Sequence, residues 1–102
     1  MKSIVQLESD KCFLCGKAFG SETHHVFGKN PQRSYSDADG LTIRVCRQCH
    51  DDIHEGSNSR QLMKALHQLG QEKWEAYYGP GITAEGKDPR TAFMERYGKN
   101  YL

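Results

Sequence analysis

The sequence predicts an α+β fold, built as one domain over residues 1–102 around a small zinc-stapled core. Two Cys-x-x-Cys pairs lie in the first half of the chain, two short strand-like runs lie between and beside them, and helical patterns fill the second half. Only 36% of the residues are hydrophobic. The apolar core must therefore be small, and chains of this size often need a metal or disulfides to hold them. We expect the core over residues 8–56 and a helical extension over residues 57–102.

The first part of the chain is expected to hold short segments around its cysteines and histidines. Residues 3–7 can form a strand. Residues 12–17 have the form of a zinc knuckle, because the glycine after the second cysteine permits a tight turn that brings two thiolates to one ion. Residues 24–28 contain β-branched and aromatic residues and end at a glycine, which is typical of a strand. Residues 28–40 are rich in Gly, Asn, Pro, Ser and Asp, which predicts an exposed loop.

A second strand is expected over residues 41–46, where Leu41, Ile43 and Val45 alternate onto one face. This run ends in the second cysteine pair. From Cys49 to Gly56 the pattern becomes helical.

Two further helices are expected after this region. Apolar residues recur at helical spacing from about residue 59 to residue 78, and Gly79-Pro80-Gly81 is expected to stop that helix. Asp88 and Pro89 have the form of an N-cap and a first helical residue, so the last helix should run from there to Gly98. The apolar spacing indicates packing on the zinc core, and His67, in the middle of the first of these helices, is expected to be polar surface.

The four cysteines form two pairs with none left over: Cys12, Cys15, Cys46 and Cys49. Zinc prefers four ligands in a tetrahedron, and two Cys-x-x-Cys turns supply them with little strain. The N-terminal residues lack the apolar stretch of a secretory signal, and no apolar run approaches the ~20 residues of a membrane span. We therefore expect a cytoplasmic protein whose paired cysteines bind structural zinc. The alternatives are two redox pairs or four free thiols, but no βαβ pattern supports a redox function.

Four of the five histidines gather in the same region of the sequence. His50 and His54 are one helical turn apart and can both reach one ion. His24 and His25 are neighbours, so on a strand their side chains point to opposite faces and only one joins that metal. Three imidazoles on an ion with an open position are typical of a catalytic site, and the fourth imidazole can act as a general base. A His-x-x-x-His pair also occurs by chance on many helices.

The order Cys-x-x-Cys, His-His, Cys-x-x-Cys-His-x-x-x-His resembles the HNH endonucleases of the ββα-metal (His-Me finger) superfamily, in their four-cysteine zinc-bound form. Many small phage proteins are of this kind, and the resemblance covers roughly residues 10–56. It implies a treble-clef-like β-hairpin and helix that grip one divalent ion. It also implies that His24, His50 and His54 bind a catalytic Mg²⁺, Mn²⁺, Ni²⁺ or Zn²⁺. His25 is then the base that activates water.

The chain departs from the family at one position. Most members have an asparagine at the start of the second strand, where it helps to fix the base histidine. The corresponding stretch here, residues 39–42, has none. Asn30 is a substitute only if the preceding loop folds back, and Asp39 or a backbone carbonyl is another candidate to orient His25.

The formal net charge of +1 does not mark the chain as a strongly basic nucleic-acid binder. The basic residues near the candidate site are the expected phosphate contacts: Lys29, Arg33, Arg44 and Arg47. Such contacts provide affinity without reading sequence. The alternative is that these charges are only a solvated surface.

Together these features predict a metal-dependent HNH endonuclease that hydrolyses phosphodiester bonds in DNA, most readily double-stranded DNA. The alternative from another class is a zinc-stabilised module that binds nucleic acid or protein without catalysis. A third possibility is that the three histidines hold a second structural zinc.

Overall fold

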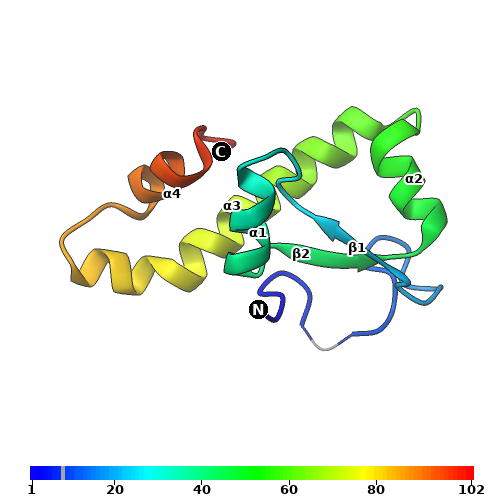
Figure 1. The fold of residues 1–102 in the computed structure, drawn as a ribbon, viewed down its shortest axis with the longest axis horizontal. Helices are drawn as coiled ribbons and strands as arrows, with labels where there is room; N and C mark the ends of the chain where they lie inside the picture. Colours follow the sequence, from blue (N-terminus) through cyan, green and yellow to red (C-terminus); the bar gives the residue numbers. More distant parts are fainter. Residues whose placement is uncertain (8) are drawn as a thin grey trace.

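The computed structural model describes residues 1–7 and 9–102. Within them the chain forms four helices and one two-stranded antiparallel sheet, which confirms the α+β class. The elements follow in the order β1 (Glu22–His25), α1 (Gln32–Asp39), β2 (Thr42–Val45), α2 (Arg47–Glu55), α3 (Ser59–Ala84) and α4 (Pro89–Tyr97). Helix α3 runs along the length of the molecule, with α2 beside one end and α4 beside the other (Figure 1). The predicted core begins at residue 8, which lies outside the described residues. None of the described helices is long and apolar enough to cross a membrane.

The hairpin of β1 and β2 places the two neighbouring histidines on opposite faces. His24 pairs with Ile43, and His25 pairs with Thr42. Successive side chains of a strand point to opposite faces, so His24 and Ile43 turn toward the core while His25 and Thr42 turn away. The predicted apolar face of the second strand is confirmed by three residues that are 0–1% exposed: Leu41, Ile43 and Val45.

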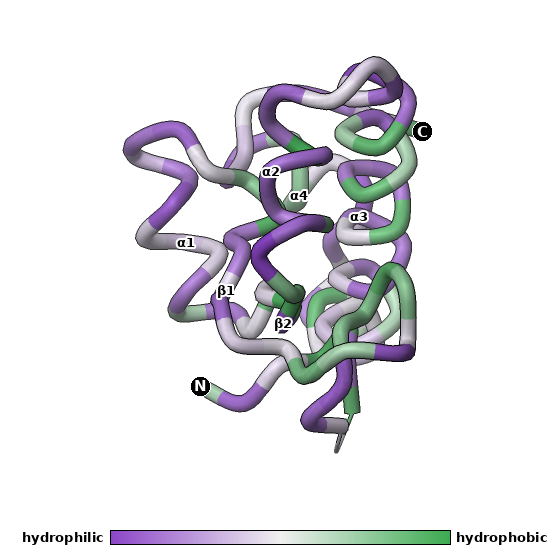
Figure 2. Tube along the Cα trace, turned by 90° about the vertical axis from the view of Figure 1, so that its right-hand side faces the viewer, coloured by the Kyte–Doolittle hydropathy of each residue, from purple (hydrophilic) through white to green (hydrophobic). Residues whose placement is uncertain are grey.

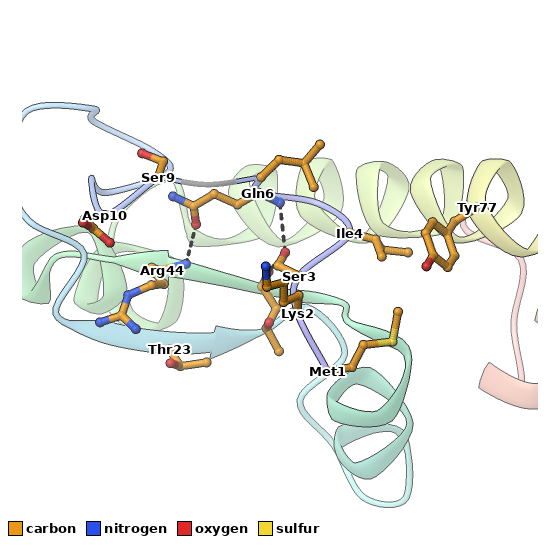
Figure 3. A pocket seen from close by; sticks show the side chains of 12 residues that line it. Met1, Lys2, Ser3, Ile4, Gln6, Ser9, Asp10, Thr23, Arg44 and Tyr77 are labelled. Carbon is orange, nitrogen blue, oxygen red and sulfur yellow. Dashed lines mark hydrogen bonds between the residues drawn. The ribbon is translucent and has the colours of Figure 1, made fainter.

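Two strand predictions are wrong in detail. The strand predicted over residues 24–28 lies at Glu22–His25, and the chain after it leaves the sheet to bury Val26 and Phe27. Residues 3–7 form no strand. Their side chains instead cover the free edge of β2, where the backbone N–H of Arg44 donates to Gln6 Oε1 at 2.7 Å (Figure 3). An alternating pattern does not distinguish a strand from a segment that satisfies a sheet edge with its side chains.

The predicted loop over residues 28–40 contains a helix, α1. Its residues are mostly hydrophilic, as are those of α2 (Figure 2), so composition alone favoured a loop. The helix is held by tertiary hydrogen bonds. The buried Ser36 hydroxyl donates to Phe27 O and accepts from Phe27 N, each at 3.1 Å. Gly40 ends the helix with a φ of 79°, a left-handed conformation that favours glycine.

Helix α3 continues past the predicted stop at Gly79-Pro80-Gly81 and ends at Ala84. The proline removes one backbone donor from the helix, but tertiary packing outweighs that loss. Gly79 is buried against Pro89, at the start of α4, and a Cβ at Gly79 would come within 3.4 Å of that ring. Helix α4 agrees with its prediction, because the Asp88 carboxylate caps it by accepting from Thr91 N at 2.9 Å and Gly98 ends it.

The core under α3 and α4 is aromatic. The Phe93 and Tyr97 rings are stacked with centroids 4.7 Å apart, and Trp74 packs edge-on against Phe93. One buried carboxylate, that of Asp39, fastens this core to the end of α1. It accepts hydrogen bonds from Trp74 Nε1 at 2.9 Å, from Tyr97 Oη at 2.7 Å and from the Arg96 guanidinium at 2.6 and 2.8 Å. The helical extension is therefore bound to the turn that leads into β2.

Candidate metal centres

The four cysteines converge from two turns, as the sequence predicts. Cys12 and Cys15 lie in a tight turn in which Gly16 N donates to Cys12 O at 2.9 Å, and Gly16 has a φ of 68°. Cys46 is the N-cap of α2, and Cys49 lies in its first turn. A backbone bond from Phe13 N to Arg44 O, at 2.8 Å, holds the turn against β2. The four sulfur atoms lie within 4.8 Å of one another.

The donor set of this cluster suits zinc. In a tetrahedron with zinc–sulfur distances of about 2.3 Å the sulfurs are about 3.8 Å apart, and the four sulfurs here lie within 4.8 Å of one another. Burial opposes ionisation of Cys12, but backbone N–H groups, with that of Cys15 first, outweigh it and lower the pKa of the Cys12 thiol to about 6. Burial and the neighbouring sulfurs raise the pKa of Cys49. Four thiolates this close repel one another unless a cation lies between them, and these residues can hold a structural metal such as zinc.

The second cluster consists of His24 on the inner face of β1 and of His50 and His54 on α2. The His24 ring centroid lies 5.4 Å from each of the other two, and these are 5.0 Å apart. One nitrogen from each ring lies within 4.8 Å of the others. The cluster therefore joins the hairpin to the helix, and its exposed member, His54, opens it to solvent.

His24 shows that this cluster fits a cation. The side chain is 4% exposed, and its Nε2 atom is buried with no hydrogen-bond partner among the described residues. Burial, followed by the charges of His50 and His54, lowers the pKa of His24 to about 4. The imidazole is therefore neutral at physiological pH, and neutral imidazole is the form that binds metal.

Glu22 orients another member of the cluster, and the sequence prediction missed it. The His50 Nδ1–H donates to Glu22 Oε1 at 2.7 Å, which leaves Nε2 as the nitrogen free for a metal. Glu22 lies two residues before His24, on the same face of β1. That spacing is the sequence signal from which Glu22 was predictable, once β1 had been placed at Glu22–His25.

His25 lies apart from the cluster, on the outer face of the hairpin. Its Nε2 is 3.5 Å from Asp37 Oδ1, a carboxylate on α1 whose side chain is 73% exposed. Together with Asn30, Arg33 and Ser34 they line a hollow of about 310 Å³. The loop before α1 folds back toward His25 and brings Asn30 to the same hollow. This is the arrangement that Asn30 needs if it is to substitute for the missing asparagine.

Asp39, the other candidate to orient His25, does not reach it. Both carboxylate oxygens are used by the α3 and α4 side chains described above. The stretch in which the resemblance predicts an asparagine, residues 39–42, includes Gly40. A Cβ at Gly40 would approach Lys2 O to 2.5 Å, so no side chain fits there without movement of the chain.

The four predicted phosphate contacts fall into two kinds. Arg44 and Arg47 have protein partners: Arg44 Nε donates to Gly20 O at 2.8 Å, and Arg47 forms ion pairs with Glu22 and Asp51 at 3.8 and 3.9 Å. Lys29 and Arg33 are exposed, and Arg33 lines the hollow beside His25.

His67 is not polar surface as predicted. Its ring is half-buried and stacks on Phe27 with centroids 5.0 Å apart. A groove of about 1060 Å³ lies between the N-terminal residues, the outer face of the hairpin and Tyr77 (Figure 3). It contains none of the candidate metal ligands.

The chain was compared with protein-family models, with curated proteins and with solved structures, and no match was found in any of the three.

Proposed function

We propose that this chain is a metal-dependent endonuclease of the HNH type, with a ββα-metal core, that hydrolyses phosphodiester bonds in DNA. The proposal rests on one observation above all. Three imidazoles from a hairpin and a helix converge around a buried nitrogen that has no partner, while a fourth imidazole from the next residue faces a polar hollow. Two metal clusters of different chemistry in so short a chain favour a scaffold site and a working site.

Each histidine has a separate task in this proposal. His24, His50 and His54 hold the divalent ion, which when bound supplies positive charge to the phosphate and to the leaving oxygen. His25 accepts the proton of the attacking water. Asp37 keeps the His25 ring at the mouth of the hollow, and Arg33 offers a charge for a neighbouring phosphate.

The metal at the histidine cluster has an open position in this proposal. The cluster contributes three ligands among the described residues, and catalytic zinc sites commonly have three protein ligands and one place for water or substrate. A second structural zinc needs a fourth protein ligand. Glu22, the nearest carboxylate that bonds to the cluster, is instead bound to His50 Nδ1.

The unpaired state of the cysteines suits a reducing compartment. We therefore place the activity in the cytoplasm of a cell, such as that of a phage-infected bacterium.

A plasmid-nicking assay with Mg²⁺, Mn²⁺, Ni²⁺ or Zn²⁺ tests the proposal. Loss of a positioned general base typically costs 10²–10⁴-fold in rate, so the His25→Ala variant is expected to nick at least about 100-fold more slowly than wild type. Thr23→Ala is the matched control, because Thr23 lies on the same strand face and has no proposed role. Equal rates for wild type and His25→Ala, or no nicking with any of the metals, would refute the proposal.

A zinc-stabilised binding module without catalysis is the second candidate. The observations that favour it are the absence of an asparagine from residues 39–42 and the formal net charge of only +1. This candidate predicts one tightly bound metal per chain and DNA binding that is unaffected by His25→Ala. A second bound metal that is lost in the His54→Ala variant argues against it.

A further inference from the structure

One flank of α3 carries two cations and a histidine at helical spacing. Arg60, Lys64 and His67 are at positions i, i+4 and i+7, so they lie on the same side of the helix. Arg60 and Lys64 are exposed, and neither forms an ion pair with any carboxylate that the structure describes. Gln71, one turn after His67, continues the same flank.

Residues 98–102 are fastened to this flank by buried amides. Gln71 is fully buried: its Oε1 accepts from Tyr101 N at 2.7 Å and its Nε2 donates to Asn100 Oδ1 at 2.8 Å. Gln68 Nε2 also donates to Tyr101 O at 3.2 Å. These bonds hold the backbone of an otherwise exposed segment, and the Lys99 ammonium lies over the Tyr101 ring at 5.2 Å.

A fourth cation, Lys29, lies in the chain that follows His25. The Phe27 ring packs between His67 and Tyr101, at centroid distances of 5.0 and 5.1 Å. Lys29 follows two residues later and is exposed. The His67 and Tyr101 rings are themselves 4.9 Å apart, so Phe27, His67 and Tyr101 tie the chain before Lys29 to the segment that carries Lys99. Burial lowers the pKa of His67, the backbone bond at Val26 opposes this, and the Lys99 and Lys29 charges lower it further.

The segments that meet here carry one sign of charge. Residues 26–33, 56–71 and 97–102 contain no Asp or Glu. Acidic residues flank these segments at Glu55, Glu72 and Glu95. The Glu75 carboxylate accepts from Gln71 Nε2 at 2.7 Å, at the end of the flank farthest from Arg60. A local patch of this kind stands out in a chain whose formal net charge is only +1.

We infer that Arg60, Lys64, Lys99 and Lys29, here called the α3 strip, bind the phosphate backbone of a DNA duplex. The inference deepens the proposed function, on which it rests for the choice of DNA as the polyanion. Arg60 follows the candidate ligand His54 by six residues, and Lys29 follows the candidate base His25 by four. The α3 strip can therefore hold a duplex beside both. Its Arg60 and Lys64 form no ion pair among the described residues, whereas Arg44 donates to Gly20 O and Arg47 lies between the carboxylates of Glu22 and Asp51.

The chain offers a matched control for a binding experiment. The test variant carries Lys64→Gln and Lys99→Gln. The control variant carries Lys73→Gln and Lys87→Gln, which removes the same charge: Lys73 lies on the other side of α3, and Lys87 lies in the loop before α4. Both are made in the His25→Ala background to prevent cleavage, and binding to a labelled DNA duplex is measured by fluorescence anisotropy over a series of salt concentrations.

Each phosphate contact contributes about 0.9 to the slope of log K against log salt. We expect the slope of the test variant to fall by about 1.8 and its affinity at about 0.1 M salt to fall by roughly 60-fold, with the control variant unchanged. Melting temperature and zinc content are compared for both variants, so that a folding defect is recognised. If the test variant is folded and both variants bind equally, the α3 strip does not bind DNA.

The two proposals fail in different ways. Wild-type nicking together with equal binding by the two variants overturns the α3 strip and leaves the nuclease standing. Selective loss of binding by the test variant, without nicking by wild type under any metal, supports the strip and overturns the nuclease. If the His25→Ala protein binds no duplex at low salt, the inference is wrong and an acidic protein becomes the partner to test.

Discussion

Replacing Glu22 by glutamine is expected to weaken metal binding at the histidine cluster without unfolding the chain. The substitution keeps the size of the side chain and removes its charge. The Glu22 carboxylate accepts from His50 Nδ1 at 2.7 Å, so it sets the tautomer that leaves Nε2 for the metal and fixes the orientation of the ring. Glutamine can still accept through its amide oxygen, but without the charge.

The size of the effect follows from the burial of this contact. Removing a hydrogen-bonded partner of a metal ligand typically costs 10–100-fold in affinity, about 1.4 to 2.8 kcal/mol. The Glu22 side chain is 33% exposed, so solvent screens the pair and supplies alternative donors and acceptors. We therefore expect the low end, a loss of about tenfold for Glu22→Gln, and a larger loss for Glu22→Ala.

Calorimetric titration of zinc into protein that already holds one zinc at its cysteines measures this loss directly. Glu55→Gln is the control, because Glu55 is exposed, lies next to His54, and has no side-chain bond among the described residues. Equal weakening by both substitutions would show that only the local charge matters. Unchanged affinity for Glu22→Gln would refute the orienting role.

Three further outcomes are expected. Asp39→Asn removes the charge that the Arg96 guanidinium meets and should lower the free energy of unfolding by about 3 kcal/mol in urea titrations, whereas the same change at the exposed Asp37 should cost under about 0.5 kcal/mol. Gly40→Asn should destabilise the chain rather than restore a family feature, by at least about 1 kcal/mol, because its side chain meets Lys2 O; an increase in melting temperature would contradict this. Burial lowers the folded-state pKa of His67 below its ordinary 6.5, so the unfolded chain takes up the proton first and stability should fall as pH drops below about 6.5; His67→Gln should remove that part of the pH profile.

The sequence predicted the metal clusters better than the elements around them. Ligand spacing is local chemistry: Cys-x-x-Cys closes a turn, and His50 and His54 share a helix face wherever that helix lies. The alternation of Leu41, Ile43 and Val45 predicted the second strand equally well, because one face of that strand is fully buried. These features depend only on near neighbours in the chain.

The elements that were missed depend on distant partners. The sequence of α1 has the composition of a loop, and the helix is stabilised by bonds from Ser36 to Phe27 and from Asp39 to α4. The continuation of α3 beyond Pro80 needs the packing of Gly79 against Pro89. Composition and propensity contain no information on these contacts. The sequence therefore predicted a loop for the first segment and a helix end for the second, which are their local preferences.

The same distant contacts bear on the missing asparagine. The resemblance predicts an asparagine at the start of the second strand that would help to fix the proposed base, His25, and residues 39–42 contain none. Helices α3 and α4 hold the chain at that point instead. The Asp39 carboxylate is bonded to Arg96 and Tyr97 of α4, and the Asp39 backbone oxygen accepts from Tyr78 Oη of α3 at 2.9 Å. The helical extension therefore stabilises the conformation of the turn that leads into β2. It follows that a chain cut before α4 would lose not a separate appendage but the support of the hairpin that carries both His24 and His25.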